Sequence, residues 1–232
     1  MGHRPAILTR PLADAQHMAR QLHRLDTALD VHIAPMLTIK IVPHQLKTGT
    51  GTPGIILTSA NAIRSLDPSI DVSGLTAWCV GPHTAKAARD RGLEVRIARG
   101  TAIDLIDLLQ TDMREPDLLY IRGTHIATPL TPRLVNAGYT VHEIITYDQV
   151  ETPIPAPVRA LMGTHRCLVS LHSVRTAHIY IRQAKEWQGQ GHILLCRSAA
   201  IAAAVGPGWI TQHVDDDADL LPTLLALART VP

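Results

Sequence analysis

The sequence predicts an α/β protein made of two similar units, each built on a doubly wound parallel sheet with helices on both faces. Three observations predict this class. Short apolar strands alternate with helical segments, the same order of elements occurs twice, and residues 140–150 form one unusually long extended segment. At about 3.3 Å per residue this segment spans roughly 35 Å, about twice the length of an ordinary strand. It is therefore a candidate bridge between two domains.

The repeat begins with an apolar strand that ends in an arginine. In the first copy the order is a strand at 5–10, a helix at about 13–25 and a Val-His pair at 31–32; in the second it is 116–122, about 129–137 and 141–142. Later elements repeat in the same order: strands at 55–57 and 167–169, 77–80 and 193–196, and 93–98 and 209–214, then helices at 102–110 and 218–228. Because these similarities keep one order, we infer an internal duplication.

The strands are mostly apolar along their whole length and do not alternate between apolar and polar residues. This pattern is typical of a parallel sheet that is covered on both faces. Such sheets bind ligands at the carboxyl ends of their strands, where the following helix presents free amide groups. We therefore expect functional residues in the turns that lead from a strand to a helix.

Small polar residues and arginines occupy these turns. The candidate binding residues are Arg10, Thr58, Ser59, Asn61, Gly81, Thr84, Arg122 and Gly123, with Ser170, Ser173 and Ser198 at the weaker turns of the second copy. One interpretation is helix capping, because hydroxyl and amide side chains satisfy unpaired helix amides. The other is that several turns converge in one cleft suited to a ligand with many carboxylates.

Three side chains have open alternatives. Arg10 and Arg122 stand at equivalent strand ends, where forked guanidinium donors could capture an anion or pair with an acidic neighbour such as Asp14. Tyr147 lies in the long segment and could simply pack there. If the segment bridges two domains, its hydroxyl could instead enter a cleft as a proton donor.

Composition excludes several classes of protein. With 22 basic and 20 acidic side chains the net charge is only +2, which argues against a nucleic-acid partner held by phosphate neutralisation. No apolar run reaches the roughly 18 residues of a membrane span, and the first residues lack the apolar stretch of a signal peptide. Cys79, Cys167 and Cys196 are odd in number and lie in apolar segments, which favours buried, reduced thiols in a cytoplasmic protein.

Other motifs have structural interpretations. The glycine-rich residues 49–54 precede their strand and lack a following Gly-Lys-Ser/Thr, so we expect a surface linker and no phosphate loop. The acidic residues 215–217 open the last helix, where they suit its dipole better than a cation. The 13 histidines show no metal-ligand spacing. We expect no metal site.

Several of these motifs together resemble the uroporphyrinogen-III synthase family, and the resemblance covers nearly the whole chain. Its carriers are Ile-Leu-Thr-Arg-Pro at 7–11, Leu-Thr-Ser-Ala-Asn-Ala at 57–62, Val-Gly-Pro-His-Thr-Ala at 80–85 with Gly92, and Leu-Tyr-Ile-Arg-Gly at 119–123 with Leu134, Gly138, Val141 and Tyr147. The resemblance implies two α/β domains joined by a two-stranded β ladder. Residues 1–34 and 151–232 would form a discontinuous domain and 37–146 an inserted one, with crossings near 34–37 and 147–150.

The resemblance also implies the reaction, a cofactor-free cyclisation of hydroxymethylbilane with inversion of its terminal pyrrole ring to give uroporphyrinogen III and water. Tyr147 matches the tyrosine proposed to aid water loss, Thr84 matches a threonine in the Gly-x-x-Thr-Ala turn, and Ser59 and Asn61 match the strand-end turn that faces the cleft. The second-copy turns at 170–173 and 197–200 depart from the family pattern, which leaves their contacts open. We expect a monomer, since nothing in the sequence demands more.

Two other functions stay open on the sequence. The altered second-copy turns allow a non-catalytic two-domain protein that binds a tetrapyrrole or another polyanionic small molecule. A nucleotide-dependent α/β enzyme has little support, because no phosphate fingerprint follows a strand.

Overall fold

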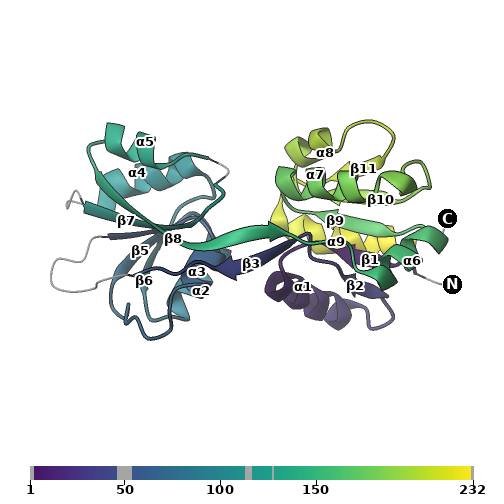
Figure 1. Ribbon diagram of the computed structural model, residues 1–232, viewed down its shortest axis with the longest axis horizontal. Coiled ribbons are helices and arrows are strands. Elements are labelled where there is room, and N and C mark those ends of the chain that lie inside the picture. The colour runs from purple at the N-terminus through teal and green to yellow at the C-terminus, as the bar shows by residue number, and fades with distance from the viewer. Residues whose placement is uncertain (1–2, 46–53, 113–116, 127, 231–232) are drawn as a thin grey trace. The chain divides into compact units, whose positions relative to one another are not determined.

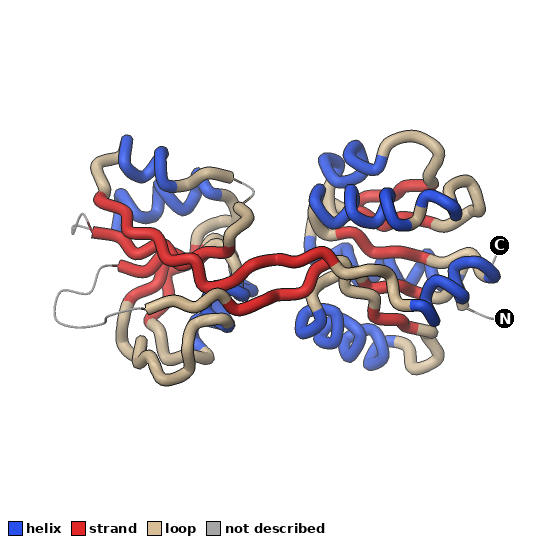
Figure 2. Tube along the Cα trace, in the orientation of Figure 1, coloured by secondary structure: helices blue, strands red, loops and turns tan. Residues whose placement is uncertain are grey.

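The computed structural model describes residues 3–45, 54–112, 117–126 and 128–230. The chain divides into two compact units: unit 1 comprises Met1–Thr38 and Val150–Pro232, and unit 2 comprises Ile39–Gln149. In each unit the strands form a central sheet between layers of helices (Figures 1 and 2). The predicted α/β class with parallel sheets is confirmed.

Unit 1 contains a five-stranded sheet with the order β11-β10-β9-β1-β2. Its elements are β1 (Ala6–Leu8), α1 (Leu12–Leu25), β2 (Val31–Ile33), α6 (Ala156–Thr164), β9 (Leu168–Leu171), α7 (Val174–Gln183), a 3-10 turn (Lys185–Trp187), β10 (Ile193–Cys196), α8 (Ala199–Val205), β11 (Ile210–His213) and α9 (Asp217–Arg229). All of its strand pairs are parallel.

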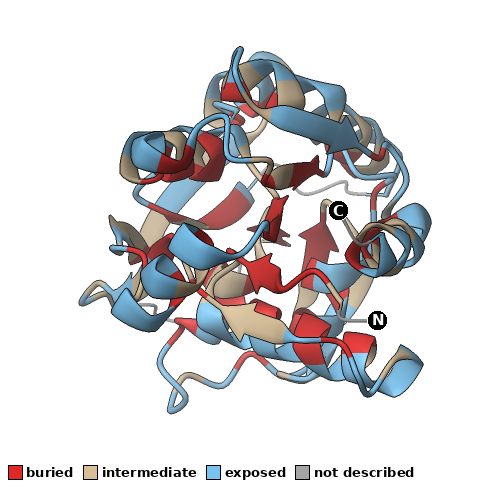
Figure 3. Ribbon diagram, turned by 90° about the vertical axis from the view of Figure 1, so that its right-hand side faces the viewer, coloured by how far each residue is buried: buried red, intermediate tan, exposed pale blue. Residues whose placement is uncertain are grey.

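Alternate strand residues of unit 1 enter two separate apolar layers. Helices α6, α7 and α8 cover one face, where Val169 and Leu171 contact them, and α1 and α9 cover the other, where Leu168 and Leu195 lie. Figure 3 shows the buried residues on the strands and on the inner faces of the helices. Since both faces are covered, the inner strands β1, β9 and β10 need apolar residues at nearly every position, whereas the edge strand β11 is exposed.

Unit 2 contains a six-stranded sheet with the order β3-β8-β7-β4-β5-β6. Its elements are β3 (Leu37–Ile41), β4 (Gly54–Leu57), α2 (Ala60–Arg64), β5 (Thr76–Cys79), α3 (Pro82–Arg89), β6 (Glu94–Ile97), α4 (Ala102–Asp112), β7 (Asp117–Gly123), α5 (Thr131–Asn136) and β8 (Thr140–Glu151). Helices α2 and α3 pack on one face of the sheet, and α4 and α5 on the other.

Several predictions about single elements are confirmed. The long extended segment is the strand β8, and all three cysteines are buried and free. Asp216 caps helix α9 by accepting a hydrogen bond from the Ala218 N–H, so the acidic run serves the helix start. Most of the glycine-rich linker expected at 49–54 lies outside the described residues, although Gly54 is the first residue of β4.

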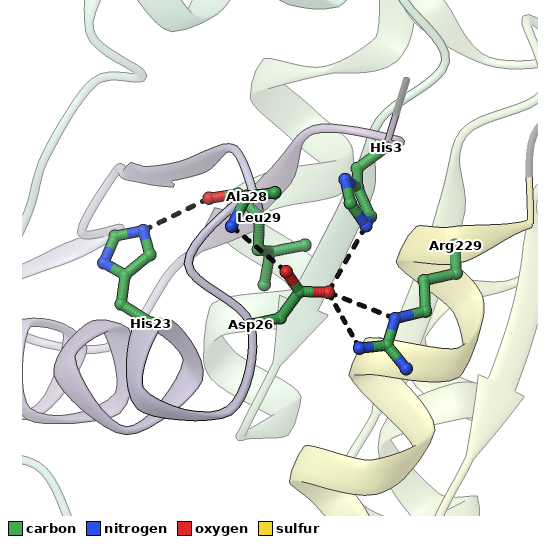
Figure 4. Close-up of polar contacts among 6 residues, drawn as sticks. All are labelled: His3, His23, Asp26, Ala28, Leu29 and Arg229. Carbon is green, nitrogen blue, oxygen red and sulfur yellow. Dashed lines mark hydrogen bonds and ion pairs between the residues drawn. The ribbon is translucent and has the colours of Figure 1, made fainter. Parts of the chain in front are cut away.

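A charged contact joins three separate parts of unit 1. Asp26, just after α1, accepts from Arg229 Nε at 3.1 Å and Nη2 at 2.8 Å, and its carboxylate lies 3.3 Å from His3 Nε2 (Figure 4). The Ala28 N–H binds the other carboxylate oxygen at 3.1 Å. The bonds from Arg229 and then from Ala28 hold the pKa of the Asp26 carboxyl below its ordinary value.

We predict that Asp26→Asn destabilises the protein more at pH 7 than at low pH. Because the folded-state pKa lies below the unfolded one, the stabilising contribution is present above the ordinary aspartate pKa of about 4 and is lost as pH falls through the folded-state pKa. Urea unfolding midpoints of both proteins at pH 7 and at about pH 3 measure this. The midpoints should differ by more at pH 7 than at the lower pH; an equal difference at both would contradict the prediction.

A candidate active site around Tyr147

The side chain of Tyr147 lies close to the backbone of the neighbouring strand. Tyr147 on β8 is paired with Gly123, the last residue of β7, and only 3% of its surface is exposed. A Cβ atom at position 123 would lie 2.6 Å from Tyr147 Cζ and 3.0 Å from its hydroxyl oxygen. Only glycine leaves room for the ring in this position.

A β-bulge sets the direction of the Tyr147 side chain. Arg122 is paired with Ile145 but the next residue, Gly123, is paired with Tyr147, so Thr146 is an extra residue on β8. An unbroken strand would place side chains an odd number of residues apart on opposite faces of the sheet. Ile144 and Tyr147 nevertheless both pack against the apolar layer under α2 and α3. The extra residue therefore turns Tyr147 toward α2.

The hydroxyl of Tyr147 is bonded to the first turn of α2. It shares a hydrogen bond with the side chain of Ser59, the N-cap residue of this helix, and Ser59 Oγ accepts from the Asn61 N–H at 3.2 Å. Burial raises the pKa of Tyr147, and the Ser59 bond offsets this only in part. The phenol is therefore protonated at neutral pH and is able to donate.

Neighbouring strand ends bring further candidates to this edge of unit 2. Leu57 of β4 is paired with both Cys79 of β5 and Ile121 of β7. The residues two positions after these three therefore lie side by side in one row across the sheet. They are Ser59, Gly81 and Gly123. These three positions lie at the carboxyl ends of β4, β5 and β7, and Tyr147 lies beside Gly123 within β8, which continues to Glu151.

Three candidates around this row have different surroundings. Gly81 caps α3 without a side chain, and a Cβ atom there would meet nothing within 4 Å. Thr84, in the first turn of α3, is 6% exposed. Thr58 Oγ1 lies 3.1 Å from the hydroxyl of the buried Tyr120, so this threonine has a partner inside the unit.

Both candidate arginines have carboxylate partners. Arg122 donates from Nε at 2.8 Å and from Nη2 at 2.6 Å to one oxygen of Glu143, and from Nη1 to the Gly123 carbonyl at 2.8 Å. Burial would raise the pKa of Glu143, but the Thr131 hydroxyl and Arg122 outweigh it and lower that pKa. Arg10 Nη2 lies 3.4 Å from Asp14 Oδ2, which is the acidic partner that the sequence suggested.

The serine candidates of unit 1 have intramolecular bonds. Ser173 Oγ accepts from the Thr176 N–H at 3.0 Å and caps α7, and Ser198 Oγ accepts from the Ile201 N–H at 3.4 Å and caps α8. Ser170 is 1% exposed and donates to the Ile7 carbonyl at 3.3 Å inside the sheet. Helix capping, one of the two interpretations of these turns, is thus observed at Ser173 and Ser198.

The sequence analysis missed several residues that shape the site. They are Thr146, which donates to the Ala62 carbonyl in α2, Ser65, which bonds to Thr146, and Glu143, which accepts from Arg122. A signal for the bulge was present in the spacing of Ile144 and Tyr147, two large residues three positions apart on one strand. In the described ranges no group of three or more His, Cys, Asp or Glu side chains could hold a metal ion. No helix in those ranges is long and apolar enough to cross a membrane.

Comparison with known protein families identifies the family of this chain. The model of the family described as Uroporphyrinogen-III synthase HemD matches residues 9–211. The chain belongs to this family. Uroporphyrinogen-III synthases are cofactor-free cyclising lyases of porphyrin biosynthesis that convert hydroxymethylbilane into uroporphyrinogen III, as the resemblance had implied.

Solved structures of uroporphyrinogen-III synthases have the same fold. The Helicobacter pylori enzyme is 16% identical, with a TM-score of 0.65 over 97% of this chain and 99% of that one. A mutant of the Thermus thermophilus enzyme is 15% identical, with a TM-score of 0.56 over 96% of each chain. No curated protein sequence matches the chain significantly.

We predict that Gly123→Ala slows formation of uroporphyrinogen III by about 10- to 100-fold, because the new methyl group displaces the Tyr147 ring from its place. Gly163→Ala is the matched control, since its Cβ would meet only Trp187 Nε1 at an ordinary 3.9 Å. Steady-state rates of type III isomer formation measure both variants. Equal rates for Gly123→Ala and the wild type would show that the close approach of ring and backbone is not needed.

Proposed function

We propose that Tyr147 assists the departure of water from hydroxymethylbilane, and that the strand ends of unit 2 hold the substrate at this hydroxyl. The observation that carries the proposal is the fixed hydroxyl itself. It lies against Gly123, which admits no side chain, and is bonded to Ser59 at the start of α2. A rigidly placed donor is what a reaction limited by leaving-group departure requires.

The chemistry assigns a narrow task to the protein. The terminal hydroxyl takes up a proton, its C–O bond breaks, and water leaves an azafulvene cation in the substrate. The substituted carbon of the far pyrrole then attacks this cation to give a spiro intermediate, whose fragmentation and re-closure invert that ring before a proton is lost. Electrophile and nucleophile both belong to the substrate, so the protein has to fold the chain and promote the loss of water.

Tyr147 is suited to this task by its surroundings. Burial raises its pKa, so the hydroxyl keeps its proton at neutral pH. Ser59, its half-buried partner, connects it to the edge where the strands end. The Tyr147 hydroxyl would donate a hydrogen bond that strengthens as negative charge develops on the leaving oxygen.

The substrate carries an acetate and a propionate on every pyrrole ring, and we propose that strand-end turns bind these carboxylates. In unit 2 the amide groups and hydroxyls near Ser59, Asn61, Gly81 and Thr84 are suited to this role, since helix amino ends attract anions. In unit 1 the proposed contacts are the capped helix starts at Ser173 and Ser198. Thr58 and Ser170 would support the turns from inside, through their bonds to Tyr120 and Ile7.

The two arginines would have different tasks. Arg10 Nη2 lies 3.4 Å from Asp14 Oδ2, and the Arg10 side chain is 29% exposed, which supports a role in binding carboxylates. Arg122 holds the Gly123 carbonyl and Glu143 with three bonds of 2.6 to 2.8 Å, which supports a role in fixing the backbone under Tyr147.

We further propose that the units are the two domains of an internally duplicated protein. The strand orders support this, because β11-β10-β9-β1-β2 and β6-β5-β4-β7-β8 match strand by strand when the two sequence repeats are aligned. Each sheet then contains the first two strands of one repeat and the last three of the other. The neighbouring strands β3 and β8 would form the connecting ladder. We expect the protein to act as a cytoplasmic monomer.

We predict that Tyr147→Phe lowers kcat for uroporphyrinogen III by about 10- to 100-fold, because the substitution removes the proton donor and keeps the ring. Purified wild-type protein supplied with fresh hydroxymethylbilane should give the type III isomer above the spontaneous type I background. Chromatographic separation of the two isomers over time gives both rates.

Tyr139→Phe is the control for this experiment, since Tyr139 lies in the same unit but packs in the apolar layer under α4 and α5. Its rate should equal that of the wild type. An unchanged kcat in Tyr147→Phe would remove the proposed role of its hydroxyl.

A further inference from the structure

Thr146, the extra residue of the β8 bulge, is completely buried and fully hydrogen-bonded. Its exposed fraction is 0%, its hydroxyl donates to the Ala62 carbonyl at 3.2 Å, and its Oγ1 lies 2.9 Å from Ser65 Oγ. The Thr146 carbonyl accepts from the Val42 N–H at 3.0 Å. A polar side chain so placed is bonded to the last residues of α2 and to nothing outside the unit.

Two consecutive residues of β8 therefore hold the two ends of α2. Tyr147 bonds to Ser59 before the first helical residue, and Thr146 bonds to Ser65 after the last one. A helix of only five residues has no stability of its own, so its position depends on such contacts. Moving Thr146 would move α2 and, with it, the partner of the Tyr147 hydroxyl.

We propose that Thr146 is a positioning residue for the reaction, acting through the Tyr147–Ser59 pair. The inference rests on the proposed role of Tyr147 but adds a separate claim, that the hydroxyl of Thr146 fixes the bulge. Thr146 itself does not touch substrate, since none of its surface is exposed.

The hydroxyl of Thr146 is needed for this role, and its volume alone is not sufficient. Valine has almost the same shape, but it would remove the hydroxyl that joins the bulge to the Ala62 carbonyl and to Ser65 Oγ. Ser65 Oγ would keep its bonds to the Asn61 and Ala62 carbonyls within α2, so the helix would lose its polar contacts with the bulge and would shift relative to it. A displacement of about 1 Å in a group that assists the reaction can cost on the order of 100-fold in rate.

We predict that Thr146→Val lowers kcat about 10-fold or more with KM changed by less than about twofold, and that Thr146→Ser restores the wild-type rate. In a Tyr147→Phe background Thr146→Val should have no further effect, because both substitutions remove the same contribution. Protein labelled at tyrosine Cζ gives a readout without substrate. The resonance that is absent in Tyr147→Phe should shift in Thr146→Val and stay in place in Thr146→Ser.

The outcomes separate this inference from the proposed function. Loss of rate in Tyr147→Phe with a normal rate in Thr146→Val would overturn the positioning role and leave the role of Tyr147 intact. An equal loss from Thr146→Val in both backgrounds would also overturn it. If Thr146→Val does not fold, Ser65→Ala removes the bond between Ser65 and Thr146 from the other side and should shift the same tyrosine resonance. An unshifted resonance together with a normal kcat in Ser65→Ala would overturn the inference.

Discussion

The arrangement of the site depends on one extra residue in strand β8. Thr146 interrupts the pairing of β7 and β8 and turns Tyr147 toward helix α2, where an unbroken strand would point it to the other face of the sheet. Gly123 then has to be glycine, because the ring occupies the place of its side chain. Ser59 has to begin α2 where it does in order to meet the hydroxyl. One local irregularity thus connects a strand, a glycine and a helix.

This arrangement is consistent with a reaction whose reactive groups all belong to the substrate. The family needs no cofactor, and a protein of this kind can accelerate the reaction by holding the substrate in one conformation and by assisting a leaving group. A tyrosine that stays protonated suits the second task. The helix starts that follow the parallel strands would suit the first, since the amino ends of helices attract carboxylates.

Much of the fold could be predicted from the sequence, because apolar runs and helix signals are local properties. Strands such as residues 168–171 are apolar at nearly every position, which indicates that both of their faces are covered, and the length of residues 140–150 indicates the strand β8. The bulge could not be predicted from the sequence, because strand register depends on pairing between residues that are distant in sequence. For the same reason the bond between Arg122 and Glu143, 21 residues apart, was missed, whereas Asp14 was found four residues after Arg10.

The most direct test of the central claim compares two leaving groups in Tyr147→Phe. Hydroxymethylbilane needs a proton to release water, whereas a bilane with an acyloxy group in place of the hydroxyl releases a carboxylate without one. Single-turnover rates of type III isomer formation should fall about 10- to 100-fold for the hydroxyl substrate and less than about twofold for the acyloxy substrate. Equal slowing with both leaving groups would contradict a role for Tyr147 in the loss of water.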